Sequence, residues 1–266
     1  MTIEERAAEF GRVFAREELN GWTYYSAGKG EDVVLLLPGG VGIGIGWLDL
    51  ALALHDDHRT ITVDYPPFAT TMSELVDGLL AVLEAEGVDR VHVVGQSAGG
   101  MVAQVLVDQA PDRVASLVFS GTGLYGPEDV DRLAGKLAAL RTTPLEEVLD
   151  TARPTLRAAW PGSADADFWI AQVEAAYRRG GRDGVVNSYA YLLDLARTSG
   201  DLRPGWQGPV LLLAADDDDP LVTAAHQRRL LDLHPGCEVR SFPDGGHSLL
   251  LTRPAEYIAA VREFLG

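Results

Sequence analysis

The sequence predicts an α/β fold: a doubly wound, mostly parallel sheet of about eight strands, flanked by helices and interrupted by a helical insertion. Short apolar runs rich in β-branched residues alternate with helix-like segments at close intervals, as in βαβ units. Residues 124–205 show helix-like segments and no buried-strand pattern. We therefore expect a core of residues 1–123 and 206–266 and a helical cap of residues 124–205.

The elements of the N-terminal half follow from their local patterns. Residues 1–20 carry glutamates among alanines and apolar residues, which predicts an amphipathic helix. Ser73 is the expected N-cap of a later helix, and Gly87 is its expected terminator. Strands are predicted at residues 22–25, 33–37 and 60–64 and in the apolar run that begins at residue 91. Helices are predicted at residues 47–55, 73–86 and 101–109. The continuously apolar run 33–37 is typical of a strand buried on both faces.

The C-terminal half begins with an apolar strand at residues 114–120 and then changes character. Helices are predicted within the insertion at residues 127–140, 144–152, 165–179 and 184–197. After the insertion, strands are predicted at residues 209–215 and 237–242, and helices at residues 221–233 and 254–265. The insertion is rich in aromatic residues, which either pack it onto the core or form a lid over a site. As a lid, it would line a substrate pocket with Trp160, Trp169 and Tyr189.

Composition excludes several functions. The formal net charge of −17 opposes binding to nucleic acid or to an anionic membrane surface, and no run is long enough for a membrane span. The single cysteine, Cys237, excludes an internal disulfide and a cysteine-rich zinc site, and it fits a cytoplasmic protein. We expect Cys237 to be a small buried residue in a late strand. No secretion signal, metal or cofactor is expected.

A candidate nucleophile follows the apolar run that begins at residue 91. That run leads into Gly95-Gln96-Ser97-Ala98-Gly99, a G-x-S-x-G pattern followed by a helix-like segment. A sharp strand-to-helix turn needs small flanking residues, and it exposes the serine hydroxyl. It also places the N–H of Ala98 at a helix N-terminus, where it can face a developing oxyanion.

The glycine-rich loop at residues 38–46 follows the strand 33–37. A nucleotide-binding turn is disfavoured, because the loop lacks G-K-[ST] and its glycines do not match G-x-G-x-x-G. We expect instead the second half of an oxyanion hole, with Gly40 as the leading N–H donor and Gly39 or Val41 as alternatives.

A serine nucleophile needs a base and a group that orients the base. Among the six histidines, only His247 lies on a glycine-flanked loop after a late strand. Four aspartates, at positions 216–219, follow the strand at 209–215. Asp219 is the favoured acid and Asp217 the alternative.

As a set, these segments resemble the α/β-hydrolase family over essentially the whole chain. The resemblance rests on the chain order Ser97, Asp219, His247 and on G-Q-S-A-G, L-L-L-P-G-G, D-D-D-D-P-L-V-T and G-G-H-S-L-L-L. By analogy, D-P-L-V-T favours Asp219 as the acid. Pro38 stands where many members have a histidine. The L-P-G-G and D-Y-P-P segments are similar to those of maspardin and proline-iminopeptidase-like members.

The resemblance and the residues together predict a serine hydrolase. Its expected substrate is a small to medium, largely apolar ester, thioester or lactone, cleaved through an acyl-enzyme. The expected partner is this small molecule alone, and the oligomeric state stays undetermined. Two alternatives remain open: a lyase, cyclase or cofactor-free oxygenase that uses the same residues as a proton relay, and a non-catalytic binding module.

Overall fold

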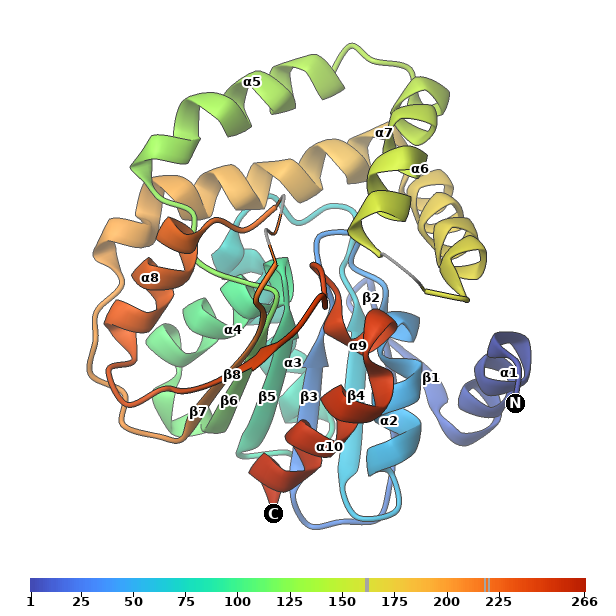
Figure 1. Ribbon diagram of the computed structural model, residues 1–266, viewed down its shortest axis with the longest axis vertical. Coiled ribbons are helices and arrows are strands. Elements are labelled where there is room, and N and C mark those ends of the chain that lie inside the picture. The colour runs from blue at the N-terminus through green and yellow to red at the C-terminus, as the bar shows by residue number, and fades with distance from the viewer. Residues whose placement is uncertain (161–162, 218, 220) are drawn as a thin grey trace.

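The computed structural model describes residues 1–160, 163–217, 219 and 221–266. Its centre is an eight-stranded sheet with the order β1-β2-β4-β3-β5-β6-β7-β8 (Figure 1). The strands are β1 (Ala15–Leu19), β2 (Trp22–Ala27), β3 (Val33–Leu37), β4 (Arg59–Asp64), β5 (Val91–Gln96), β6 (Val114–Ser120), β7 (Val210–Ala215) and β8 (Glu238–Phe242). The mostly parallel α/β sheet predicted from the sequence is thus confirmed.

Strand direction places several loops at one edge of the sheet. The pairs β1/β2 and β2/β4 are antiparallel, whereas every pairing from β4 through β3, β5, β6 and β7 to β8 is parallel. The loops after β3, β5, β7 and β8 therefore leave the same edge, because carboxyl ends of parallel strands share an edge. The glycine-rich loop, Ser97, the aspartate run and His247 begin at these ends.

Helices cover both faces of the sheet. The α-helices of the described chain are α1 (Ile3–Val13), α2 (Leu48–Leu54), α3 (Met72–Ala85), α4 (Ala98–Gln109), α5 (Val130–Leu140), α6 (Leu145–Ala159), α7 (Ala166–Thr198), α8 (Ala224–Leu233), α9 (Leu249–Thr252) and α10 (Pro254–Leu265), of which α5, α6 and α7 lie apart from these two layers. Alternate residues of β3 separate two cores: Leu35 and Leu37 pack in a cluster with residues of α3 and α4, and Val34 and Leu36 pack in a cluster with residues of α1, α2 and α10. None of the helices within the described ranges is long and apolar enough to cross a membrane.

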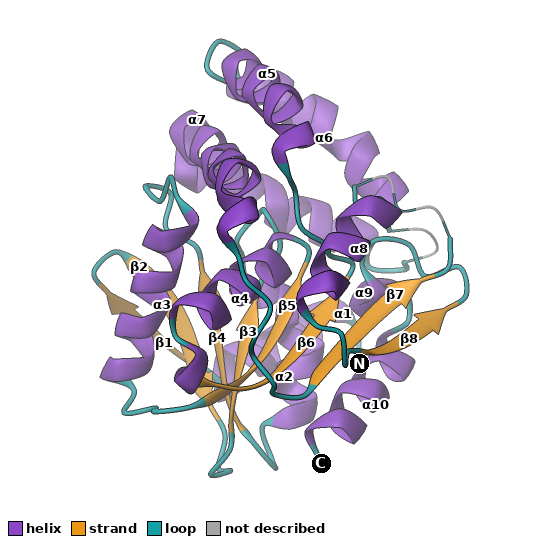
Figure 2. Cartoon of the chain, turned by 90° about the vertical axis from the view of Figure 1, so that its left-hand side faces the viewer, coloured by secondary structure: helices purple, strands orange, loops and turns teal. Residues whose placement is uncertain are grey.

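The helices α5, α6 and α7 lie in sequence between β6 and β7. Figures 1 and 2 show them stacked beyond the end of the sheet, apart from the layers on its two faces. Leu133 and Leu137 of α5 pack with Val185 and Val186 of α7 in a separate apolar cluster. The helix α7 is kinked at Gly181, whose φ of 65° and ψ of −171° lie outside the helical region.

The expectation of a helix over residues 1–20 is wrong in its second half. The helix α1 ends at Val13, and residues 15–19 form β1, an edge strand paired with β2. The turn is Asn20-Gly21, with φ of 50° and 83°. Positive φ at both central residues is typical of a tight hairpin, and Asn-Gly is its strongest sequence signal. The glutamates of residues 15–19 lie on an exposed edge strand whose burial does not alternate, so the Asn20-Gly21 turn is the usable sequence signal for it.

Two smaller expectations, for the cap of α3 and for Cys237, also need correction. Thr71, not Ser73, caps α3, because Thr71 and Glu74 form a reciprocal capping box. The two helices expected at residues 165–179 and 184–197 are both present, as the parts of α7 before and after the kink at Gly181. Cys237 is only half-buried and precedes β8, although burial still raises the pKa of its thiol to about 11.

The helix α4 presses against the end of β3, and glycine permits this contact. A Cβ atom at Gly99 would lie 2.0 Å from the carbonyl oxygen of Leu37, and one at Gly95 would lie 2.5 Å from the carbonyl oxygen of Gly99. Both distances are far below van der Waals contact. The turn between β5 and α4 therefore requires glycine on both sides of Ser97.

This contact predicts opposite effects for two glycine substitutions. Gly99→Ala should lower the free energy of unfolding by about 3 kcal/mol, because the backbone of β3 has to move. Gly135→Ala is the matched control: Gly135 lies in α5 with nothing within 4 Å of its Cβ position. This variant should gain about 1 kcal/mol in helix propensity. Urea denaturation measures both, and equal effects would contradict the packing argument.

Candidate active site

Ser97 occupies the turn between β5 and α4 in a strained conformation. Its φ of 53° and ψ of −122° are rare for a residue with a side chain. The N–H of Ser97 donates to the carbonyl oxygen of Ser120 at 2.9 Å, and its carbonyl oxygen accepts from the N–H of Gly100 at 3.0 Å. This geometry matches the strand–turn–helix expected from G-x-S-x-G.

Two neighbours that sequence reasoning missed hold this turn. The Thr122 hydroxyl, fully buried after β6, donates to the carbonyl oxygen of Ser97 at 2.6 Å. The Gln96 amide nitrogen lies 3.4 Å from the carbonyl oxygen of His247. Gln96 lies inside the G-x-S-x-G pattern, so its position next to Ser97 could have been predicted from the sequence. No sequence pattern pointed to Thr122.

The glycine-rich loop lies beside this turn. A Cβ atom at Gly39 would be 3.4 Å from the Cβ of Ser97, and one at Gly40 would be 3.9 Å from the Cβ of Ala98. The N–H groups of Gly40 and Ala98 donate to no protein acceptor among the described residues, and both residues line the same cavity. Gly39 and Val41, the alternative donors, also line it.

His247 is paired with Asp219. The Nδ1 atom of His247 lies 2.7 Å from Oδ2 of Asp219, and the histidine is 5% exposed. The other carboxylate oxygen accepts N–H groups from Leu221 at 2.8 Å and Val222 at 3.2 Å. Burial works to raise the pKa of Asp219, but the hydrogen bonds and the charge of His247 outweigh it, so the pKa lies below its ordinary value.

This pairing determines which nitrogen of His247 is available. An ionised carboxylate can only accept hydrogen bonds, so Nδ1 carries the proton and donates it to Asp219. The Nε2 atom is then the free acceptor on the ring. His247 is thereby able to take up a proton at Nε2 with a negative charge behind it.

The other described aspartates of this run contact backbone instead. Both carboxylate oxygens of Asp217, the alternative acid, lie 3.1 Å from the N–H of Gly246. Asp216 accepts the N–H of Asp244 at 3.1 Å. Asp218 and Pro220 lie outside the described residues.

Backbone contacts bring His247 next to the Ser97 turn. A Cβ atom at Gly121, the residue after β6, would lie 2.1 Å from the carbonyl oxygen of His247. Gly121 follows Ser120, whose carbonyl accepts the N–H of Ser97. The loop after β8 therefore crosses over the ends of β5 and β6. Ser97 and His247 both line one cavity, although their chain positions are far apart.

This cavity has a volume of about 540 Å³ and lies between the sheet edge and the inserted helices. Trp160, Trp169 and Tyr189, the aromatic residues expected there, all line it. Its walls are mainly apolar and include Met101, Leu133, Leu140, Val173 and Leu250. Arg132, Lys136 and Glu147 are the charged lining residues among those described. The indole N–H of Trp160 donates to the hydroxyl of Ser248 at 3.1 Å, which ties the insertion to the His247 loop.

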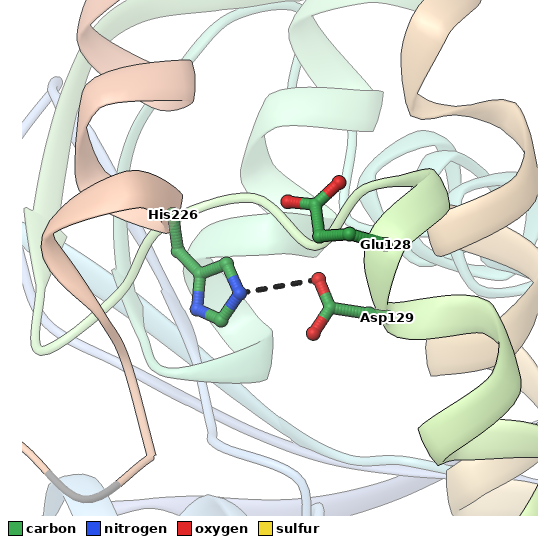
Figure 3. A group of neighbouring side chains, drawn as sticks. All are labelled: Glu128, Asp129 and His226. Carbon is green, nitrogen blue, oxygen red and sulfur yellow. Dashed lines mark hydrogen bonds and ion pairs between the residues drawn. The ribbon is translucent and has the colours of Figure 1, made fainter.

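A second polar cluster lies apart from this cavity. Glu128, Asp129 and His226 bring potential metal ligands together where α8 meets the start of α5 (Figure 3). Their polar atoms already have protein partners. Nε2 of His226 lies 3.1 Å from Asp129, and its Nδ1 accepts the N–H of Thr223 at 3.2 Å. Asp129 also binds Arg132, and Glu128 binds Arg229. The cluster acts as a polar clamp between α8 and the insertion.

Three known proteins illustrate what the chain is similar to. A protein of Caulobacter sp. (strain K31) named "Putative carbamate hydrolase RutD" is 28% identical over 244 residues, which cover 87% of this chain and 90% of the relative. The enol-lactonase from Burkholderia xenovorans LB400 has a TM-score of 0.75 at 20% identity, with 94% of this chain and 99% of that one covered. A thermophilic esterase from Thermogutta terrifontis has a TM-score of 0.77 at 21% identity, covering 95% and 97%.

The two solved structures support the fold alone. A comparison with the sequence profile of a whole family shows the family. The sequence profile of the alpha/beta hydrolase fold matches residues 32–254, which include the glycine-rich loop, the Ser97 turn, the aspartate run and His247. The chain therefore belongs to the alpha/beta hydrolase fold family.

Proposed function

We propose that the chain is a serine hydrolase in which Ser97 is the nucleophile, His247 the general base and Asp219 the acid that orients it. The observation that carries this proposal is the 2.7 Å contact between Nδ1 of His247 and Asp219, beside a serine at positive φ. A buried histidine with a carboxylate on one nitrogen and a cavity on the other is suited to proton transfer with a hydroxyl.

The proposed reaction proceeds in two halves. The Ser97 Oγ attacks the substrate carbonyl carbon while His247 Nε2 takes the hydroxyl proton. The N–H groups of Gly40 and Ala98 stabilise the oxyanion, His247 protonates the leaving group, and an acyl-enzyme forms. Water then attacks the acyl carbon with His247 again as base, which releases the acid and restores Ser97.

The cavity supports a small to medium, largely apolar ester, thioester or lactone as substrate. A volume of about 540 Å³ lies within the range of small-molecule sites, and apolar walls favour an apolar acyl or alcohol group. The names carbamate hydrolase, enol-lactonase and esterase of the similar proteins refer to hydrolysis of carbonyl compounds, which is consistent with this class. We propose that α5, α6 and α7 act as the cap that encloses the substrate.

Ser97→Ala should abolish almost all hydrolysis of a p-nitrophenyl ester. Only the contribution of binding and the oxyanion hole should remain, on the order of 10³–10⁴ over the uncatalysed rate. A fluorophosphonate probe should label the wild-type chain at Ser97 and leave the variant unlabelled. Ser73→Ala, at an exposed serine of α3, is the control and should keep full turnover and labelling. Undiminished turnover in Ser97→Ala would refute the mechanism.

The acid is tested by a pair of isosteric variants. Asp219→Asn should lower kcat about 10⁴-fold, because an amide can donate to Nδ1 and so favour the wrong tautomer of His247. Asp217→Asn should lower kcat less than about tenfold, since an amide oxygen can still accept the N–H of Gly246. Steady-state kinetics at neutral pH compares them. A larger loss at Asp217 would transfer the role of the acid to that residue.

A further inference from the structure

The loop at residues 38–46 has little rigidity of its own. Gly39, Gly40 and Gly42 can adopt many backbone conformations, and Gly42 has a φ of 69°. An oxyanion donor, by contrast, has to be aimed before the substrate binds. The direction of the N–H groups in this loop must therefore come from hydrogen bonds with other parts of the chain.

Several of these hydrogen bonds come from the sheet side. The N–H of Tyr65, after β4, donates to the carbonyl oxygen of Gly42 at 2.9 Å, and the N–H of Gly44 donates to Asp64 at 2.6 Å. Within the loop, the N–H of Gly42 donates to the carbonyl oxygen of Gly39 at 2.8 Å. These bonds hold both ends of the loop but leave the carbonyl group of Gly40 to another partner.

That partner is Tyr191 of α7. Its hydroxyl lies 3.2 Å from the carbonyl oxygen of Gly40 and donates to it. The side chain is 3% exposed and packs in the same core cluster as Leu37 and Ala98. Burial raises the pKa of Tyr191, so the hydroxyl keeps its proton. Among the hydrogen bonds found for residues 39–42 in the described chain, this one alone comes from the inserted helices.

The peptide geometry links this bond to the oxyanion donor. In a trans peptide the C=O and N–H groups point in opposite directions. The Gly39 carbonyl faces Gly42, so the N–H of Gly40 points away from Gly42. The Gly40 carbonyl faces Tyr191, so the next peptide plane is fixed as well. The bond between Gly42 and Gly39 thus directs the N–H of Gly40, whereas the bond from Tyr191 directs the N–H of Val41. With the peptide planes on both sides of Gly40 held, the turn that carries these N–H groups keeps one conformation.

The segment that carries Tyr191 is itself anchored to the core. The Asn187 amide donates to the carbonyl oxygen of Pro67 at 2.8 Å, and Asp194 accepts the N–H of Met72 at 3.0 Å. Both anchors follow the kink at Gly181. These two bonds fix the position of the Tyr191 hydroxyl relative to the sheet. They do not depend on the position of the part of α7 before the kink.

We propose that Tyr191 is a positioning residue, whose hydroxyl holds the peptide group after Gly40 and so keeps the turn that carries the oxyanion donor in one conformation. The inference rests on the proposed serine hydrolysis. It makes the insertion part of the oxyanion hole as well as a cover over the cavity.

Tyr65 offers a matched control. Its ring stands nearly perpendicular to that of Tyr191, at 84° with centroids 6.4 Å apart. Its hydroxyl is also buried, but it has no hydrogen-bond partner among the described residues. Tyr65→Phe therefore removes a buried hydroxyl from the same environment without releasing the loop.

The experiment compares Tyr191→Phe and Tyr65→Phe with a p-nitrophenyl ester and with a trifluoromethyl ketone. The ketone mimics the tetrahedral intermediate: Ser97 Oγ bonds to the carbonyl carbon, His247 takes the proton, and the carbonyl oxygen becomes an oxyanion. Tyr191→Phe should lower kcat about tenfold with KM within about twofold, since full loss of an oxyanion donor costs about 10²–10³ and a loosened donor costs less. Its affinity for the ketone should fall by the same factor. Tyr65→Phe should change neither quantity.

The outcomes separate this inference from the proposed function. Equal effects of the two variants, or a rise in KM with kcat unchanged, would overturn the positioning role while Ser97→Ala remained inactive. Continued turnover by Ser97→Ala would overturn the proposed function and this inference with it. Thermal unfolding of both variants, with assays at least 15 °C below the midpoint, ensures that a lower kcat in Tyr191→Phe reflects the folded enzyme.

Discussion

The contact between the start of α4 and the end of β3 is the constraint on which the site depends. The carbonyl oxygen of Leu37 lies where a Cβ of Gly99 would be, so the helix starts directly against the strand. At this contact Ser97 has a positive φ, and the glycine-rich loop lies beside Ala98. The strained serine and the N–H groups of Gly40 and Ala98 thus lie around one packing contact, which glycine permits.

Glycine allows the close contact between α4 and β3, but the glycines of the loop after β3 make that loop flexible. Hydrogen bonds from β4, from the loop itself and from Tyr191 hold it in place. The inserted helices therefore have two relations to the site. Both parts of α7 line the cavity, with Trp169 and Tyr177 before Gly181 and Tyr189 after it. The part after Gly181 also docks on the core and contacts the loop.

The acidic run after β7, like the glycine-rich loop, is held by hydrogen bonds to another loop. Asp216, Asp217 and Asp219 each bond to the loop after β8, the first two through backbone N–H groups and the third through the His247 ring. Like charges so close together repel one another, and each of these carboxylates is offset by a donor from the facing loop. The run works as a clamp between two loops, with one position directed at the imidazole.

The sequence by itself determined the features that depend on neighbouring residues: the sheet strands, the G-x-S-x-G turn and the loops that leave one edge. These follow from hydrophobic period and from the steric needs of glycine. The hairpin of β1 and β2 was not predicted, although Asn20-Gly21 is a strong sequence signal for such a turn. The sequence favoured Asp219 over Asp217, but only the tertiary structure decided that Asp219 faces His247 and that Tyr191 reaches the glycine-rich loop. These partners stand 28 and 151 residues apart, and no local pattern encodes which of several similar side chains a distant loop will meet.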